Sequence, residues 1–305
     1  MIKSKTMRSN LLLVITAFIW GTAFIAQKAG VDLLDPCTYN GIRSYLGFAA
    51  LVPVILVMDA KSKKNNTYKP DDKKLLICGG IVCGIIMFIA STLQTAALVD
   101  ADAGKAGFMT ALYIIIVPLL GVFIGKKIKS IIWISVAIAT AGLYFLCVKK
   151  GTSFSFNKSE LLLLACAVMF SFHILAIDYF SPKVNGVKLS ALQFFVVGCI
   201  SLVYILIVDK PSVSDIIRCG IPLAYAGVMS SGVAYTLQIV AQKDTDPAVA
   251  SLIMSLESFF ALLAGIAFGE KPGVRELIGC MFMMTAIVLV QLPEKSIKQG
   301  DKSNA

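Results

Sequence analysis

The sequence contains little charge and almost no histidine, and its cysteines lack the spacing of a metal or redox site. Charged residues make up 15% of the 305 positions, whereas hydrophobic residues make up 57% and mean hydropathy is +0.82. A soluble globular domain carries about 25% charged residues. The composition therefore excludes an ordinary soluble enzyme or binding domain and predicts a membrane protein.

The eight cysteines and the single histidine, His173, do not suggest a metal centre. Most of the cysteines fall inside apolar runs and none forms a C-x-x-C pair, so core packing is their expected use. A zinc site needs several clustered ligands of these kinds. We therefore expect no metal, no other cofactor and no catalytic residues.

The formal net charge of +10 comes from basic residues that lie singly or in small groups between apolar runs. A protein that binds nucleic acid would gather them on one face or along one helix. We expect no nucleic-acid partner. The basic residues are better explained as loop charges of a protein that sits in a lipid bilayer.

The apolar residues form ten runs, each close to the length of about 20 residues that a helix needs to cross the hydrocarbon core. We predict an all-α membrane protein with ten transmembrane helices and no separate soluble domain. The predicted spans are residues 11–29, 40–58, 75–98, 104–124, 130–148, 160–179, 189–208, 219–241, 248–268 and 273–292.

Lysine and arginine are distributed unequally between the two sides of the predicted membrane. With the N-terminus inside, the first half places three basic residues in the tail, six in the polar loop 59–74 and three after the fourth span. The opposite side of that half has only Lys105. Cytoplasmic loops carry the excess of positive charge. We predict a multi-pass protein of the plasma or inner membrane with both termini in the cytoplasm.

One stretch of the sequence occurs twice. Residues 92–107 (TLQTAALVDADAGKAG) return 144 positions later as residues 236–251 (TLQIVAQKDTDPAVAS). A weaker match at a shift of about 150 places Trp20 on Phe170 and Arg43 on Gln193.

Each half would then contain five spans, and because five is odd, equivalent helices would point in opposite directions. We predict a first repeat at residues 9–150, a second at 159–293 and a polar tail at 294–305. Inverted repeats of this kind are typical of secondary transporters.

Several stretches resemble the EamA family of the drug/metabolite transporter superfamily. They are WGTAF at 20–24 with Lys28, Arg43, and two similar segments: TLQTAAL leading into AGFMTALYIIIVPLLGVFIGKK, and TLQIVAQ leading into AVASLIMSLESFFALLAGIAFGEK. The resemblance covers residues 11–292. It implies a ten-helix carrier with two inverted five-helix repeats and a central cavity, which moves small metabolites and often exports amino acids.

This sequence departs from the family pattern at one point in the ninth span. Family members commonly have Glu-Pro there, whereas here Ser258 follows Glu257. The proline kink that the family pattern would place in this span is therefore not implied. The fourth span keeps Pro118.

Glu257 lies near the middle of the ninth predicted span, where an ionised carboxylate costs roughly 2.5 to 3.5 kcal/mol on insertion scales. It must face a cavity, a partner or a proton. We favour a site for proton coupling or for a substrate amine over a protonated acid that only bonds a neighbouring helix. Its repeat partner is Tyr113, which could offer an aromatic wall and a hydroxyl, or could simply be packed.

Three further polar or aromatic side chains lie within predicted spans. Trp20 sits away from the interfacial belt where tryptophan concentrates, which favours cavity lining over packing. Gln94 and Gln238 occupy equivalent positions in the two halves. A buried amide needs partners, which could be the substrate or another helix.

His173 and Arg43 complete the set of candidate substrate and coupling residues. A lone histidine in an apolar run is more often a hydrogen-bonded structural residue than a proton shuttle, so His173 is secondary. Arg43 could bind a carboxylate in bidentate fashion, or could pair with Asp32 and Asp35.

Gly121 and Gly125, like Gly265 and Gly269, have the spacing at which small residues let helices approach closely. We expect them to form packing seams. The GVFIGKK segment at 121–127 is one residue short of a phosphate-binding loop and lies at a span end, so nucleotide hydrolysis is not expected.

Together these features predict a secondary transporter of small metabolites, with export of amino acids or related organic compounds by alternating access around a midplane cavity. Its partners would be a small-molecule substrate, the bilayer and protons as a coupling ion. An importer or exchanger of the same fold is the main alternative. An intramembrane enzyme acting on lipid-linked substrates, or a membrane scaffold, is a less favoured one. The sequence indicates no oligomeric state.

Overall fold

The computed structural model describes residues 2–101, 103–148, 157–267 and 273–291, and its regular elements over these ranges are all helical. Ten segments are long and apolar enough to cross a membrane, which confirms the predicted fold class. The elements of the first half are α1 (Ile2–Val31), α2 (Pro36–Lys64), α3 (Lys73–Leu98), α4 (Ala103–Ala111), α5 (Tyr113–Phe123) and α6 (Ser130–Cys147).

The second half has the same number of spans but more interruptions. Its elements are α7 (Lys158–Phe180), α8 (Gly186–Tyr204), η1 (Ile205–Asp209), α9 (Val213–Arg218), α10 (Gly220–Ala224), η2 (Tyr225–Ala234), α11 (Tyr235–Gln242), α12 (Pro247–Met254), α13 (Glu257–Ala267) and α14 (Val274–Gln291). The η elements are π-helical turns, which are frequent at functional sites. The predicted tail 294–305 lies outside the described residues.

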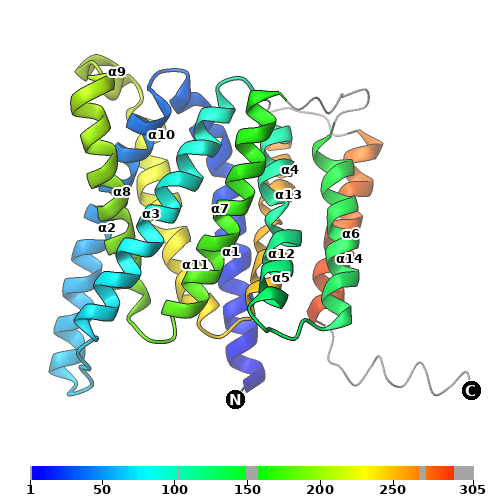
Figure 1. Cartoon of the computed structure of the whole chain (residues 1–305), viewed down its shortest axis with the longest axis horizontal. Coiled ribbons are helices and arrows are strands. Elements are labelled where there is room, and N and C mark those ends of the chain that lie inside the picture. The colour runs from blue at the N-terminus through cyan, green and yellow to red at the C-terminus, as the bar shows by residue number, and fades with distance from the viewer. Residues whose placement is uncertain (1, 102, 149–156, 268–272, 292–305) are drawn as a thin grey trace, which may run out of the picture.

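The helices form one bundle in which α1 runs through the middle (Figure 1). The pair α6 and α14 packs together at one end of the bundle, and α2, α3 and α8 lie at the other. The start of α1 and the end of α14 lie at the same face, as an even number of spans requires. Because α7 forms the sixth span and four spans lie between it and α1, α7 runs in the direction opposite to α1.

Glycines allow the closest contacts between helices. A Cβ added to Gly84 would lie 2.7 Å from the Cβ of Val196, and one added to Gly227 would lie 2.5 Å from the Cβ of Leu46. Lipid tails are as apolar as leucine, so membrane helices associate through such close packing and not through the hydrophobic effect. The glycines therefore bring α3 onto α8 and η2 onto α2.

The prediction that Gly121 and Gly125 form a helix-packing seam is wrong. A Cβ added to Gly121 would first meet Ile128 at 3.5 Å, and Gly125 has nothing within 4 Å. Gly125 instead has φ of +82°, a backbone conformation in which a residue without a Cβ is favoured. It makes the turn that follows α5. Gly269, in the equivalent pair, lies outside the described residues.

The fourth and ninth spans are each broken near the middle. The first break falls at Leu112, between α4 and α5, and the second falls at Ser255 and Leu256, between α12 and α13. At each break a backbone N–H bonds three residues back, from Leu112 to Met109 (3.3 Å) and from Leu256 to Ile253 (3.2 Å).

The ninth span breaks without the proline of the family pattern. The Ser255 hydroxyl donates to the Leu252 carbonyl at 2.7 Å, and serine bonds of this type compete with the helical ladder and bend helices. Transporters often carry such discontinuous helices at their binding sites. In this chain Tyr113 and Glu257 are the first residues after the two breaks.

Candidate functional site

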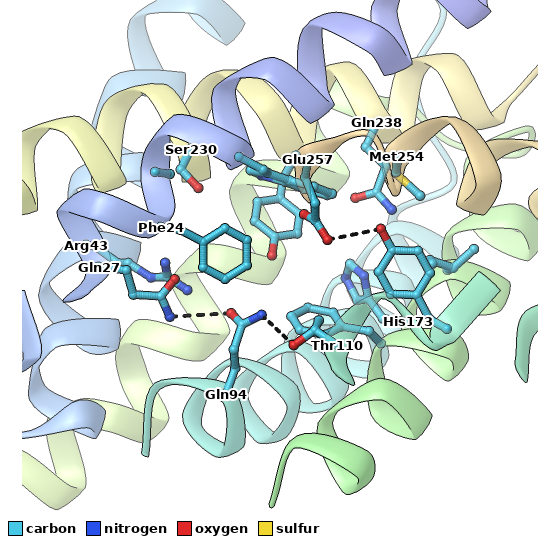
Figure 2. Close-up of a pocket in the computed structure, with 16 residues that line it drawn as sticks. Phe24, Gln27, Arg43, Gln94, Thr110, His173, Ser230, Gln238, Met254 and Glu257 are labelled. Carbon is cyan, nitrogen blue, oxygen red and sulfur yellow. Dashed lines mark hydrogen bonds between the residues drawn. The ribbon is translucent and has the colours of Figure 1, made fainter. Parts of the chain in front are cut away.

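A cavity lies at mid-depth in the bundle, between the broken spans and α1. All seven candidate residues from the sequence line it. The full lining is Trp20, Ala23, Phe24, Gln27, Arg43, Gln94, Thr110, Tyr113, Phe170, His173, Ile174, Ser230, Tyr235, Gln238, Met254 and Glu257. Figure 2 shows these side chains converging from helices of both halves of the chain.

Glu257 and Tyr113 meet across the cavity. The Tyr113 hydroxyl donates to Glu257 Oε1 at 3.2 Å (Figure 2), and Glu257 as a residue is only 5% exposed. Each residue is held at the start of its half-helix, so the two breaks aim the phenol and the acid at each other. No cation forms an ion pair with Glu257 among the residues that the structure describes. The acid can therefore take up either a proton or a cationic ligand.

Aromatic side chains form one wall of the cavity. The ring centroids of Trp20 and Tyr235 are 4.5 Å apart, and Phe24 and Phe170 also face the space. The indole N–H of Trp20 is buried and has no hydrogen-bond partner in the described part of the chain. This placement agrees with cavity lining for Trp20, and it leaves a donor directed at whatever occupies the cavity.

The equivalent glutamines Gln94 and Gln238 are both buried at the cavity but differ in their contacts. Gln94 donates to Thr110 at 3.2 Å and accepts a long bond from Gln27 at 3.4 Å. Gln238 donates to Gln242 at 2.9 Å, while its carbonyl oxygen has no partner among the described residues. Helix contacts thus account for Gln94, whereas Gln238 keeps an acceptor free for a ligand.

His173 is fully buried and bonds Gln193 through Nε2 at 3.0 Å. Its ring meets Tyr235 edge-on, with centroids 6.1 Å apart. The second ring nitrogen is buried without a partner in the described structure. His173 is therefore a hydrogen-bonded residue of the cavity wall, as the sequence favoured, with one nitrogen left over.

Arg43 reaches the cavity from α2 and is 6% exposed. Its guanidinium lies 5.8 Å from the ring centroid of Tyr39, within the range of a cation–π contact. The alternative that Arg43 pairs with Asp32 or Asp35 is wrong. Asp35 instead caps α2 by accepting from Cys37 at 2.8 Å, and no described residue gives Arg43 a hydrogen bond or an ion pair.

Some lining residues were not predicted. Gln27 follows Trp20 by seven residues, which places both on one face of α1, and Tyr235 precedes Gln238 by one helical turn. The pattern of one helix face was thus available in both cases. Phe170 was aligned with Trp20 by the weaker repeat match, and both residues line the cavity.

The lining suits reversible binding of a polar small molecule. It combines unpaired donors and acceptors with aromatic surface, as ligand sites do. Among the described residues, no group of three or more histidine, cysteine, aspartate or glutamate side chains is placed to hold a metal ion.

Comparison with known proteins gives the same architecture. The model of the EamA-like transporter family matches the chain twice, over residues 7–148 and 157–292. A solved structure titled "Crystal structure of protein" is 17% identical, covers 95% of this chain and 98% of its own, and superposes with a TM-score of 0.76. At this identity the likeness shows the fold alone.

The curated relatives are transporters by name. An uncharacterized transporter of Archaeoglobus fulgidus is 27% identical over 94% of this chain and 87% of its own length. The uncharacterized inner membrane transporter YedA of Escherichia coli is 21% identical over 90% of this chain and 87% of its own length.

Proposed function

Because this chain belongs to the EamA-like transporter family and is a multi-pass membrane protein, we propose that it exports amino acids or related small organic compounds by alternating access. The family and the named relatives point to a transporter and not to an enzyme. The export direction and the substrate class come from the family resemblance. The physical argument for transport comes from the residues that line the cavity.

The observation that carries the proposal is the cavity itself, with polar groups of both halves facing it at mid-depth. Buried groups such as Trp20 Nε1 and Gln238 Oε1 have no partner among the described residues. Buried polar groups are otherwise almost always bonded, so each exception calls for an explanation. A transported molecule and its water would satisfy them. A scaffold protein would have no need of such a cavity.

The two matches to the family model support two repeats, and one contact supports a two-fold relation between them. Tyr113 and Glu257 are 144 positions apart, the shift that aligns the repeated sequence, and they bond each other. A residue that touches its own equivalent lies close to the axis that relates the two halves. We place the axis through this pair, in the plane of the membrane, where rocking of the halves would expose the cavity to either side.

Glu257 is the proposed coupling group. Its carboxyl would take a proton in one step of the cycle and release it, or bind a substrate amine, in another. The surrounding wall residues Tyr113, Trp20, Gln94, Gln238, His173 and Arg43 would hold the substrate. With both termini in the cytoplasm, export would move the substrate toward the face opposite the 59–74 loop.

Efflux from proteoliposomes tests the proposal. Vesicles preloaded with labelled amino acids should lose them faster than protein-free vesicles, and faster still when the outside is made acidic. In Glu257→Gln, which keeps the side-chain size, the acidic outside should give no acceleration. Loss of label from wild-type vesicles at the protein-free rate, for every amino acid tried, would contradict the proposal.

The same vesicles separate export from the main alternative. An exchanger moves label only when unlabelled substrate is present on the far side. A uniporter moves it without that requirement and without a response to the pH gradient. Orientation-selective blocking of one face, through a cysteine placed in the 59–74 loop, then gives the direction of net movement.

A further inference from the structure

Arg43 is a buried cation with no hydrogen-bond or ion-pair partner among the residues that the structure describes. The side chain is 94% buried, it lines the cavity, and its guanidinium contacts the face of Tyr39. None of the described carboxylates pairs with it, since Asp35 caps α2 and Glu257 accepts from Tyr113. Burying an ion is strongly unfavourable unless an opposite charge or hydrogen bonds compensate for it.

We propose that Arg43 binds a carboxylate of the transported compound, so that substrates of this site are small amphipathic carboxylates and not carboxylate-free amines. The guanidinium presents a planar fork of N–H donors that matches the two oxygens of a carboxylate. The proposal rests on the proposed function and names the group that its site requires.

The position of Arg43 gives the site a direction. In Figure 2 it lies with Gln27 on one side of Phe24, while Glu257 lies on the other side. The equivalent position in the second half is Gln193, whose side-chain carbonyl oxygen bonds His173 and which carries no charge. Among the described residues that line the cavity, the permanent cation is Arg43, contributed by the first half, with apolar rings beside it. A carboxylate would bind at Arg43 while the apolar body of the substrate contacts Phe24.

Ligand sets that differ in one group test this assignment. The probes are phenylalanine and leucine, their primary amides, the corresponding amines without the carboxylate, and the corresponding acids without the amine. Thermal stabilisation of the purified protein gives an apparent Kd for each probe, because a ligand that binds the folded state raises stability. Acids with or without the amine should bind, while the amides and amines should bind about 10- to 100-fold more weakly.

Three variants complete the test. Arg43→Gln, which installs the residue of the second half, should weaken the acids to the level of the amides, whereas Arg43→Lys should retain part of the difference. Arg218→Gln removes an exposed arginine and should change nothing. Equal binding of acids and amides, or acids that bind Arg43→Gln normally, would overturn the proposal while leaving transport of amines intact. Binding of no probe at all would count against both this proposal and the proposed function.

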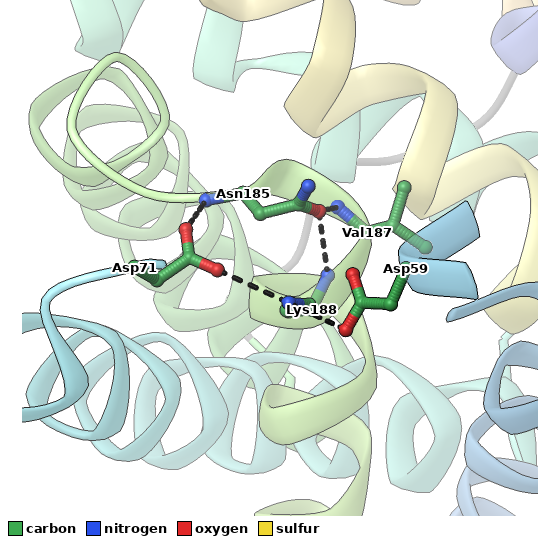
Figure 3. Close-up of polar contacts among 5 residues, drawn as sticks. All are labelled: Asp59, Asp71, Asn185, Val187 and Lys188. Atoms are coloured by element: carbon green, nitrogen blue, oxygen red, sulfur yellow. Dashed lines mark hydrogen bonds and ion pairs between the residues drawn. The ribbon is translucent and has the colours of Figure 1, made fainter. Parts of the chain in front are cut away.

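A separate set of contacts concerns α2 and α8, which pack along their length and are joined at both ends. At one end the Thr38 hydroxyl of α2 donates to Asp209 at 2.6 Å, in the η1 turn that continues the span of α8. At the other end Lys188 Nζ lies 2.9 Å from Asp59 and 3.3 Å from Asp71 (Figure 3).

The two ends are related by the weaker repeat shift. Adding 150 to Thr38 gives Lys188, and adding 150 to Asp59 gives Asp209, so each end contact corresponds to the other with its partners exchanged. The helix caps follow the same rule. Asp35 caps α2 and Asn185, 150 positions later, caps α8.

The interior of this seam is tight as well. A Cβ added to Gly41 would lie 2.5 Å from the Cβ of Ser201, and one added to Gly198 would lie 2.8 Å from the Tyr45 ring. Gates at opposite faces of a transporter open in turn. Here both ends are closed in the same structure and the middle leaves no space.

From these contacts we infer that the α2–α8 seam is a pivot that stays closed while the rest of the two halves rock around it. Cysteines at 38 and 209, or at 59 and 188, in a chain whose native cysteines are replaced, allow each end to be joined by a short cleavable cross-linker. Efflux measured before cross-linking establishes that transport is intact. Cross-linking at either end should then leave at least about half of the efflux.

A gate would behave differently. Cross-linking would stop efflux, and cleavage of the linker would restore it, which would overturn the inference without touching the proposed function. Lys188→Gln in the otherwise native chain gives a second readout. A pivot contact should affect thermal stability and leave KM for the substrate unchanged, whereas a gate contact should change KM.

Discussion

The two halves of the chain differ in chemistry where Tyr113 meets Glu257, near the middle of the fourth and ninth spans. Tyr113 and Glu257 occupy the same place in the repeat, both start a half-helix after a break, and both face the cavity. One is a phenol and the other is an acid. Both halves therefore have the broken helix, whereas the second half alone has an ionisable carboxyl group at this position.

Other pairs of corresponding positions also have similar helix packing but different cavity side chains. Gly84 packs against Val196 and Gly227 packs against Leu46. Leu46 and Val196 are 150 positions apart, and the two glycines are 143 apart, one short of the shift of the repeated stretch, so the two contacts are similar but not strictly equivalent. The cavity residues are not equivalent in chemistry: Arg43 aligns with Gln193. The helix contacts are thus alike in the two halves, whereas the side chains that face the cavity differ between them.

The largest expected effect on transport comes from removing the ionisable group of Glu257, which leaves neutral side chains at both equivalent positions. Glu257→Gln should reduce efflux by at least about tenfold, because a hydrogen bond to a charged group contributes about 1.5 to 3 kcal/mol. The measurement is initial efflux rate with and without an acidic outside. Ser258→Ala, at the adjacent position, serves as the control for local packing and should keep the pH response.

Exchanging the two residues sharpens the comparison further. Glu257→Tyr alone should lose both transport and stability, since it places two phenols in the space of a phenol and an acid. Adding Tyr113→Glu should restore stability by about 1 kcal/mol or more, as expected for residues in contact. Denaturation of all four members of the cycle measures the coupling. Additive effects of the two substitutions would show that the pair is not in contact.

Substitutions at Gly84 and Gly227 test whether the two helix contacts contribute equally to stability. Gly84→Ala and Gly227→Ala should each destabilise the protein by about 1 to 3 kcal/mol, because the added Cβ meets another side chain at less than 3 Å. Gly220→Ala, where nothing lies within 4 Å, is the matched control. Thermal unfolding in one detergent compares them. A clear difference between the first two variants would argue against equivalent seams.

The smallest effect is expected for Tyr113→Phe. It removes one hydroxyl from the Glu257 carboxyl, and a single hydrogen bond contributes about 0.5 to 1.5 kcal/mol. Efflux should fall by no more than about tenfold and should keep its response to the pH gradient. Loss of that response would move the coupling role from the acid to the phenol.

The sequence predicted the spans and the cavity residues because both leave local marks. Ten apolar runs gave ten helices, and an ionisable or amide side chain inside such a run, like Glu257 or Gln94, must face a cavity or a partner. Hydrogen-bond and ion-pair partners that depend on tertiary packing could not be predicted from the local sequence. The break at Ser255 depends on a side-chain bond to the backbone, and the absence of an ion pair at Arg43 depends on where Asp35 points.

The glycine pairs show the limit of spacing alone. Gly121 and Gly125 have the spacing of a packing motif, yet Gly125 lies in a turn. Gly84 and Gly227 make close helix contacts although no short sequence motif predicts them. Which face of a helix meets another is decided by the whole bundle.

Accessibility of one cavity residue tests the central claim most directly. Ser230 lines the cavity and is nearly buried, so a cysteine there, in a chain whose native cysteines are replaced, reports access from each side of a vesicle. A membrane-impermeant thiol reagent applied to either face alone should label it, and bound substrate should slow the labelling. Labelling from one face only, whatever the substrate or pH gradient, would contradict alternating access through this cavity.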